Sequence, residues 1–485
     1  MDLNKKNFAP LVEAMKKYSA DGALAFHTPG HKQGLGAHKF LRELITAEGL
    51  RQEVSLMEEL DDLHSPHSCI KAAEILAAEL FHAAEVFFMV NGTTSAVQAM
   101  ILATLKPNDL VFVPRNSHRS IMSGIILSGA IPIFLPIEFS STLKIPLNLT
   151  VETLELAIKK FPRAKALILT SPNYYGVAAD VKKIAELLHE KKMLLLVDEA
   201  HGAHLNFSEE LPPSATDSDA DLVAQSTHKI LGSLTQTSML LIGKNFIGAE
   251  KVRRAASLLQ TTSPNYLLLA SLDIARLQME ETGAEKISRA IELSKKLRAE
   301  INLIDGMKTF DAVENFFLDL TKVTVNIENL KLTGLDAEKI LRHEFKIQCE
   351  LSDAANLLFL ITYADNEEKI FKLIDALRKV KRLQGEKVES FFHPPVKNIS
   401  VAKVSPREVF FSEVESVDLE KSVGKICAEE VTFYPPGIPI LNLGEIITAE
   451  IIDYIRENTK IGGRIIGATD VELNTIKIIE NIGVV

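Results

Sequence analysis

Short apolar runs alternate with helical patterns from Val86 to about residue 250. Runs of three to five apolar residues with polar boundaries are typical of strands that are buried on both faces of a sheet. Helical periodicity lies between them, around residues 95–105, 119–128, 151–160 and 180–191. The alternation predicts an α/β fold with a seven-stranded, mostly parallel sheet. The predicted strands are residues 86–90, 110–113, 131–135, 166–170, 193–197, 222–224 and 239–242.

The segments before and after this sheet show other patterns of apolar and polar residues. Residues 7–20 and 70–81 predict helices, and residues 249–304 have the pattern of long amphipathic helices throughout. Further on, strand patterns at 321–327, 347–350 and 357–362 alternate with helical patterns near 336–344 and 367–382. The final segment, 398–485, combines short strands, a loop at 433–439 and a helix around 445–458.

These patterns predict that the chain is divided into an N-terminal segment and three domains. Residues 384–397, which contain Pro394 and Pro395, are the best linker in the sequence. We therefore expect an N-terminal segment (1–60), a large domain (61–305), a small α/β domain (306–385) and a C-terminal α+β domain (386–485).

The amino-acid composition argues against several classes of protein. The 485 residues are 46% hydrophobic and 24% charged, with a formal net charge of −10, which disfavours nucleic acid or an anionic membrane as the main partner. No apolar run approaches the roughly 18 residues of a membrane span. Cys69, Cys349 and Cys427 are widely spaced, so neither a disulfide framework nor a zinc site is expected, and a reducing cytoplasm is the expected location.

Two predicted strands end in residues that suit pyridoxal phosphate (PLP). The run 193–197 ends at Asp198, and the run 222–224 is soon followed by Ser226, Thr227, His228 and Lys229. Ligands of open parallel sheets bind at this edge. An amine can bind the cofactor's aldehyde, and an acid can hold the proton of its ring nitrogen. Lys229 and Asp198 are the residues for these roles, although a surface loop with an ordinary lysine would look the same.

Hydroxyl groups and a helix start offer a site for the cofactor's phosphate. Ser226 and His228 are short polar groups beside Lys229. Gly92, Thr94 and Ser95 follow the first strand of the large domain and open a helix, where free backbone N–H groups bind anions. An ordinary Ser/Thr helix cap is the alternative interpretation.

Other residues on the same edge are further candidates. His118 follows the second strand and could lie flat on a pyridine ring, or simply cap the next helix. Ala200 leaves room for the ring beside Asp198, and His201 is a candidate for a catalytic or supporting role. Residues 170–176 form a loop at the end of the fourth strand, near the cofactor or the substrate.

Two histidine-containing loops lie near the N-terminus. Thr28 and His31 belong to the first loop, which glycines and Pro29 constrain. The second loop spans residues 60–67, and its spacing of aspartate and histidine matches no metal motif. We expect no metal site, so a metal hydrolase is the weakest of the possible functions.

The motifs together resemble one enzyme family. They are TPGH (28–31), LDDLHSP (60–66), NGTTS (91–95), PRNSH (114–118), SPNYYGV (171–177), DEAHGAH (198–204), STHK-LGSLTQ (226–236) and YPPGIP (434–439). In this order they resemble the prokaryotic ornithine/lysine/arginine decarboxylases, PLP enzymes with the aspartate-aminotransferase-like fold.

The resemblance assigns roles to residues of this chain. It implies that Lys229 is the Schiff-base lysine, that Asp198 is the partner of the ring nitrogen and that His118 stacks on the ring. Thr94, Ser95, Ser226 and His228 would bind the phosphate. Thr28, His31 and Tyr434 are candidates for contacts with the substrate or with the residues that surround it. The resemblance also implies a homodimer, or a larger homo-oligomer, with active sites at the subunit interface. Because the TPGH loop begins by residue 28, the chain looks like the short form that lacks the N-terminal wing domain.

The expected reaction is decarboxylation of a basic amino acid to the corresponding polyamine-pathway amine. Arginine is the first choice of substrate, by family association, followed by lysine or ornithine. Glu408 and Glu445 are guesses for residues that read the end of the substrate side chain. Transamination or β-elimination would use the same lysine and aspartate, and a non-catalytic relative would keep only the fold.

Overall fold

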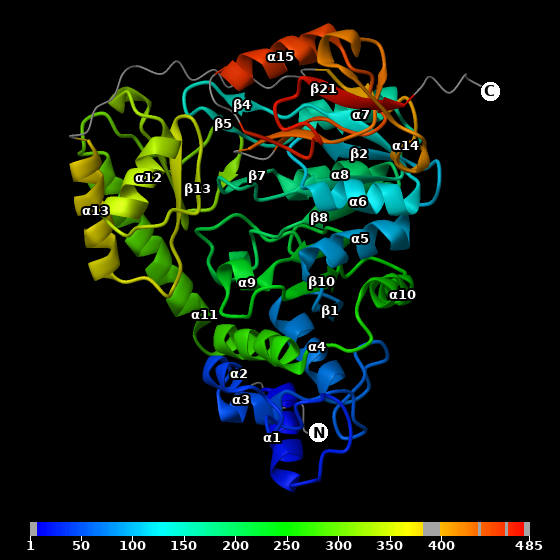
Figure 1. Cartoon of the computed structure of the whole chain (residues 1–485), viewed down its shortest axis with the longest axis vertical. Coiled ribbons are helices and arrows are strands. Elements are labelled where there is room, and N and C mark those ends of the chain that lie inside the picture. Colours follow the sequence, from blue (N-terminus) through cyan, green and yellow to red (C-terminus); the bar gives the residue numbers. More distant parts are fainter. Residues whose placement is uncertain (1–6, 382–397, 435–437, 461–463, 480–485) are drawn as a thin grey trace. The chain divides into compact units, whose positions relative to one another are not determined.

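The computed structural model describes residues 7–381, 398–434, 438–460 and 464–479. The chain folds into two compact units, whose elements are labelled in Figure 1. The first unit comprises Met1–Thr104, Leu196–Phe207 and Ser214–Ala284; the second comprises Leu105–Leu195, Ser208–Pro213 and Glu285–Val485.

The first unit is built on four strands in the order β1-β10-β9-β8. β9 pairs with β8 in parallel, whereas β10 is antiparallel to both β9 and β1. The strands are β1 (Glu85–Met89), β8 (Leu194–Asp198), β9 (Leu222–Gln225) and β10 (Ser238–Ile242). The helices are α4 (Cys69–Leu80), α5 (Gly92–Thr104), α9 (Thr227–Ile230), α10 (Ala249–Leu259) and the start of α11 (Tyr266–Ile301), with the 3₁₀ turn η1 (Leu205–Phe207).

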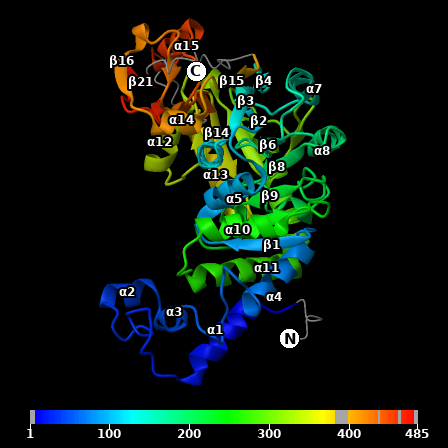
Figure 2. The same ribbon diagram turned by 90° about the vertical axis from the view of Figure 1, so that its right-hand side faces the viewer.

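An N-terminal arm completes the first unit. It consists of α1 (Pro10–Asp21), α2 (Lys39–Leu44) and α3 (Ala47–Gln52). The fully buried Asp273 of α11 accepts a hydrogen bond from the backbone N–H of Leu11 at 3.0 Å and pairs with Arg276 at 2.9 Å, which fastens α1. Figure 2 shows α2 and α3 on the far side of α11 from β1, so the arm lies away from the sheet of its own unit.

The second unit contains the strand order β6-β2-β3-β15. β2 pairs in parallel with β3 and β6, and β15 is antiparallel to β3. The elements are β2 (Leu110–Pro114), α6 (Arg119–Ser128), β3 (Ile131–Leu135), β4 (Phe139–Ser140), β5 (Ile145–Pro146), α7 (Val151–Lys160), β6 (Ala166–Thr170), β7 (Val177–Ala178), α8 (Val181–Glu190) and β15 (Ser400–Val401).

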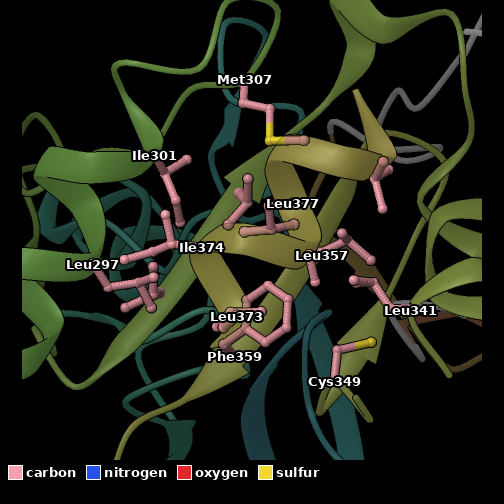
Figure 3. Packing of buried hydrophobic residues seen from close by; sticks show 14 of the residues in the cluster. Leu297, Ile301, Met307, Leu341, Cys349, Leu357, Phe359, Leu373, Ile374 and Leu377 are labelled. Atoms are coloured by element: carbon pink, nitrogen blue, oxygen red, sulfur yellow. The ribbon is translucent and has the colours of Figure 1, made fainter. Parts of the chain in front are cut away.

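A small α/β layer follows α11 in the same unit. Its sheet has the order β12-β14-β13, and the apolar face of α13 packs on it and on the end of α11. Figure 3 shows Leu373, Ile374 and Leu377 of α13 among Leu297 and Ile301 of α11. The elements are β11 (Phe317–Leu318), β12 (Lys322–Asn326), η2 (Glu328–Leu330), α12 (Gly334–Glu344), β13 (Leu351–Ser352), β14 (Asn356–Leu360) and α13 (Glu367–Val380).

The C-terminal part has its own apolar core, which includes Phe433, Tyr454 and Ile476. Its elements are α14 (Pro406–Phe411), β16 (Glu415–Asp418), η3 (Leu419–Lys421), β17 (Ile426–Cys427), β18 (Val431–Tyr434), β19 (Ile438–Leu441), α15 (Ala449–Lys460), β20 (Arg464–Ile466) and β21 (Thr475–Ile479).

The α/β fold class and all seven predicted strands are confirmed, but the large sheet has eight strands. The eighth, β15, has two residues and leaves no periodic pattern. The helical prediction for 249–304 was wrong at residues 260–265, where Pro264 separates α10 from α11. The predicted strand at 347–350 was wrong, because the strand β13 lies at Leu351–Ser352.

Two other predictions concern segments that lie wholly or partly outside the described residues. The linker prediction for 384–397 lies outside them. The predicted loop at 433–439 is an antiparallel pair, β18 and β19, joined by residues 435–437, which also lie outside them. Among the helices of the described segments, none is long and apolar enough to cross a membrane.

Candidate active site

Asp198 is the last residue of β8 and is only 3% exposed. The apolar residues before it are buried, and the parallel register places Asp198 opposite Ala224 of β9. The backbone N–H of Ala200 donates to Asp198 Oδ1 at 3.2 Å, and Ala200 is itself buried. The β8 strand thus holds a buried carboxylate at its carboxyl end.

Lys229 lies one short turn beyond the neighbouring strand, β9. The turn α9 begins directly after Ser226, whose carbonyl accepts a hydrogen bond from the backbone N–H of Lys229 at 3.1 Å. Lys229 Nζ lies 3.1 Å from Nε2 of His201, and the His201 side chain is buried. A primary amine therefore lies within hydrogen-bond reach of an imidazole that can hold or accept its proton.

The N-terminus of α5 supplies donors for an anion. Gly92 begins the helix at φ +77°, a conformation that glycine adopts without strain, and its N–H donates to the carbonyl of Gln236 at 2.9 Å. The first N–H groups of any α-helix lack partners within the helix. Thr94 is exposed there, whereas Ser95 is buried and its hydroxyl donates to the carbonyl of Gly92 at 2.8 Å. This bond lies within the first turn of the helix and points the Ser95 hydroxyl hydrogen at the backbone.

The segment between β9 and Lys229 adds further polar groups. Nδ1 of His228 lies 2.8 Å from the carbonyl of Thr237, so this nitrogen carries the hydrogen, and the ring is oriented. The hydroxyl of the buried Ser226 lies 3.4 Å from the same nitrogen. The Thr227 hydroxyl is also buried, and it has no hydrogen-bond partner within the described ranges.

These side chains fit PLP. Within the first unit, a lysine amine, a buried carboxylate, a helix N-terminus and several hydroxyls lie at or just after the carboxyl ends of three strands of one sheet, β9, β8 and β1. The orphaned hydroxyl of Thr227, one residue after Ser226, is the kind of group that a bound ligand satisfies. The donor set suits an anion, as a phosphate requires, and the carboxylate suits a protonated ring nitrogen.

His118 belongs to the second unit, where it caps α6. It is exposed, and its Nδ1 accepts hydrogen bonds from the backbone N–H of Ser120 at 3.2 Å and from the Ser120 hydroxyl at 2.8 Å. His118 therefore does cap the next helix, as the alternative interpretation expected. It leaves the imidazole at the start of a helix that follows the end of β2.

The other candidates for substrate contacts have mixed outcomes. Thr28 is exposed, in the loop between α1 and α2. His31 is fixed within the N-terminal arm, where its Nε2 lies 2.7 Å from Glu53 Oε2 and its Nδ1 accepts from the N–H of Gly34 at 3.0 Å. Tyr434 ends β18, and its side chain lies outside the described residues.

The guess that Glu445 reads the substrate is not supported, because Arg115 already binds this carboxylate. Both side chains are buried; Arg115 Nη1 donates to Glu445 Oε2 at 3.1 Å, and a second guanidinium nitrogen bonds the other oxygen. The Ser400 hydroxyl also donates to Glu445 Oε1 at 3.1 Å. Arg115 lies in the PRNSH motif, so this ion pair ties the loop of His118 to the C-terminal part.

The loop 60–67 has a structural role. The buried Asp61 accepts hydrogen bonds from the backbone N–H groups of Ser68 at 2.8 Å and Ile70 at 3.0 Å, which caps the start of α4. His64 lies 2.6 Å from the Ser257 hydroxyl. In the described part of the chain, no cluster of three histidine, cysteine or acidic residues could hold a metal ion.

Sequence reasoning missed Glu199 and Gln225, which lie directly beside Asp198 and Ser226. Glu199 is 1% exposed, and its carboxylate accepts hydrogen bonds from Gln225 Nε2 and from the backbone N–H of Ala215, both at 2.7 Å. The pKa of Glu199 is raised to about 8, chiefly by burial; the two hydrogen bonds oppose this shift, and the nearby Asp217 adds to it. A polar residue at the end of a strand gives no local signal of such a contact.

Fold and site together define a fold type I PLP enzyme. Residues 9–324 match the family model of the Orn/Lys/Arg decarboxylase major domain, and residues 383–471 match that of the C-terminal domain. The chain therefore belongs to the Orn/Lys/Arg decarboxylase family, and it is a PLP-dependent decarboxylase of basic amino acids.

Individual relatives agree with this assignment. The arginine decarboxylase of Halalkalibacterium halodurans is 40% identical over 99% of both chains, and that of Bacillus subtilis is 39% identical over 97% of this chain and 98% of the relative. The crystal structure of the Francisella novicida lysine decarboxylase LdcF superposes with a TM-score of 0.84 at 22% identity, covering 98% of this chain and 81% of that one. The structural likeness supports the fold alone.

Proposed function

We propose that this chain is an arginine decarboxylase that releases carbon dioxide and agmatine. The similarity to arginine decarboxylases carries this proposal: identity is 39–40% over nearly the full length. It falls to 24% for lysine decarboxylases such as the inducible enzyme of Escherichia coli. A difference of this size favours arginine over lysine.

The residues of the first unit would divide the chemistry between them. Lys229 would bind the cofactor through its amine and give way to the amine of the substrate. Asp198, buried at the end of β8, would hold the proton on the ring nitrogen. When bound, PLP supplies an electron sink for the pair released at Cα as carbon dioxide leaves. Ala200 is a small residue and would leave room for the cofactor ring beside Asp198.

Proton transfer would rest on Lys229 and His201. Their nitrogen atoms are 3.1 Å apart, so the imidazole can hold a proton that the lysine amine delivers to Cα, or can deliver it directly. The burial of His201 keeps this proton away from bulk water.

The phosphate would be held by the start of α5 and by the segment before Lys229. Thr94, Ser95, Ser226 and His228 would supply hydroxyl, imidazole and backbone donors, with the turn at Gly92 shaping the helix start. His118 would stack on the ring. Its cap hydrogen bonds to Ser120 fix the imidazole at the start of α6, which supports a positioned ring.

We further propose that the enzyme works as a homodimer with the active sites at the subunit interface. The N-terminal arm exposes large apolar side chains, which is unfavourable in water unless they are covered. The loop of Thr28 and His31 belongs to this arm, on the far side of α11 from β1, which favours a contribution to a partner's site (Figure 2). The exposed residues are Leu24, Phe26, Leu35, Phe40 and Leu44.

The cytoplasm is the proposed location. Cys69, Cys349 and Cys427 are all buried and unpaired, and burial raises the pKa of each thiol to about 12. Such thiols act as small apolar residues, as expected of a protein from a reducing compartment.

Product analysis by mass spectrometry tests the function. PLP-loaded protein is incubated separately with arginine, lysine and ornithine. We expect agmatine from arginine at a kcat/KM at least about tenfold above those for the other two amino acids. Cadaverine or putrescine as the main product would replace arginine by lysine or ornithine as the substrate. A keto acid instead of an amine would contradict decarboxylation.

A further inference from the structure

A chain of hydrogen bonds joins the ends of three strands to the start of α5. The Glu199 carboxylate accepts from Gln225 Nε2 at 2.7 Å. The backbone carbonyl of Gln225 accepts from the Ser238 hydroxyl at 2.7 Å, and the Ser238 hydroxyl accepts from the Thr93 hydroxyl at 3.0 Å. The four residues come from the ends of β8, β9 and β10 and from the first turn of α5.

Three members of this series of hydrogen bonds are sequence neighbours of residues proposed to hold the cofactor. Glu199 follows Asp198, Gln225 precedes Ser226, and Thr93 precedes Thr94. The ladder of β8 and β9 ends with Asp198 opposite Ala224, and the N–H of Glu199 then donates to the carbonyl of Ala224 at 3.0 Å. The bond between the Glu199 and Gln225 side chains thus joins the residues that directly follow the last pair of this ladder.

The packing around Glu199 permits little movement. Glu199 is 1% exposed, Gln225 is fully buried, and the N–H of Ala215 bonds the second carboxylate oxygen at 2.7 Å. A Cβ atom added to Gly202 would lie only 2.5 Å from Cγ of Glu199. The side chain is therefore fixed from three directions.

The pair can stay hydrogen-bonded when Glu199 is neutral. Oε1 of Gln225 is buried and has no partner among the described residues. Rotating the Gln225 amide by half a turn would present this oxygen to a protonated Glu199, because the two ends of an amide have nearly the same shape. A glutamine at position 199 could make the same bond through its own amide N–H.

We propose that Glu199 and Gln225 form a hydrogen-bonded brace that positions Asp198 and the segment Ser226–Lys229 for binding PLP. Both are positioning residues, since they act through their neighbours. The inference rests on the proposed roles of Asp198 and Lys229. It adds that the hydrogen bond between the two side chains, rather than the charge of Glu199, is what the site requires.

Substitutions at both ends of the bond test the brace. Glu199→Leu and Gln225→Leu each remove it, whereas Glu199→Gln preserves it. PLP affinity is followed by titration with the visible absorbance of the bound cofactor, and kcat and KM are measured on the loaded enzyme. We expect each leucine variant to bind PLP about ten- to a hundredfold more weakly, with a lower kcat and little change in KM, and Glu199→Gln to stay within about threefold of the wild type.

Two results would overturn the proposal. The first is a leucine variant with wild-type PLP affinity and kcat but a lower melting temperature, which would give the pair a merely structural role. The second is a Glu199→Gln variant as impaired as Glu199→Leu, which would make the charge essential. If the leucine variants do not fold, Glu199→Asp, whose carboxylate is withdrawn by one methylene, takes their place. A wild-type chain that binds no PLP would instead refute the proposed function.

Discussion

Lys229 Nζ and Nε2 of His201 lie 3.1 Å apart, on adjoining loops after β9 and β8. This contact joins the residue proposed to bind the cofactor to a buried imidazole, a group that can both accept and donate a proton.

His201→Phe should keep PLP bound but lower kcat by about 10²- to 10⁴-fold, because an imidazole that serves as acid or base contributes that much. The measurement is the steady-state rate of amine formation across pH, together with the absorbance of bound cofactor. His343→Phe, on α12, is the matched control and should keep the wild-type rate. A His201 variant with an unchanged kcat and pH profile would remove His201 from the proton path.

Asp198→Asn should retain the cofactor yet lose several orders of magnitude in kcat, because a neutral amide cannot stabilise a protonated ring nitrogen. Absorbance and kcat report the two effects separately. Asp375→Asn, which alters an exposed ion pair with Lys379, should leave both unchanged. A nearly normal kcat for Asp198→Asn would mean that another group holds the ring proton.

Glu199→Gln should stabilise the protein above about pH 8. Burial raises the pKa of Glu199 from its ordinary 4.5 to about 8, with Asp217 adding to the shift. The folded state therefore holds this proton more tightly than the unfolded state, and stability falls as pH rises from about 5 to 8, then levels off. Glutamine does not ionise, so its advantage should grow over the same interval to the order of a few kcal/mol.

Thermal unfolding from pH 5 to 9 checks this dependence. Glu281→Gln, at an exposed position of α11, is the control and should follow the wild type throughout. Parallel melting curves for Glu199→Gln and the wild type over the whole range would contradict a buried proton at Glu199.

The ion pair of Arg115 and Glu445 should behave as a unit. Removing either partner alone leaves a buried charge unpaired and should cost about 3–5 kcal/mol, whereas replacing both with methionine should restore most of the loss. The measurement is a double-mutant cycle of Arg115→Met and Glu445→Met by denaturant unfolding. Additive losses in the double variant would show that the two side chains do not depend on each other.

Local patterns were enough to predict much of the fold. The seven strand runs are continuous apolar segments, so their positions could be read one at a time. β15 could not, because a two-residue strand is defined by its partner, β3, some 270 residues away in the chain. The break at 260–265 had a local signal in Pro264 that the surrounding amphipathic pattern obscured.

Some residues of the site could likewise be predicted from local patterns, and others could not. Asp198 and Lys229 stand out because each follows a predicted strand, and Gly92 and Ser95 because they open a helix. Glu199 and Gln225 belong to the same two strand ends, yet nothing in the sequence says that their side chains meet. Glu445 remained a guess for a substrate contact, because an acidic residue far along the chain gives no sign of its buried partner, Arg115.

Chemical fixation shows directly whether Lys229 is the residue that carries the cofactor. PLP-loaded protein is reduced with borohydride, which makes the bond between a lysine and PLP permanent, then digested and mapped by mass spectrometry. Lys229→Ala and the exposed-site control Lys251→Ala are treated in the same way. We expect the added mass on the Lys229 peptide in the wild type and in Lys251→Ala. For Lys229→Ala we expect no labelled peptide and no amine product. Label on a different lysine, or undiminished turnover in Lys229→Ala, would contradict this role for Lys229.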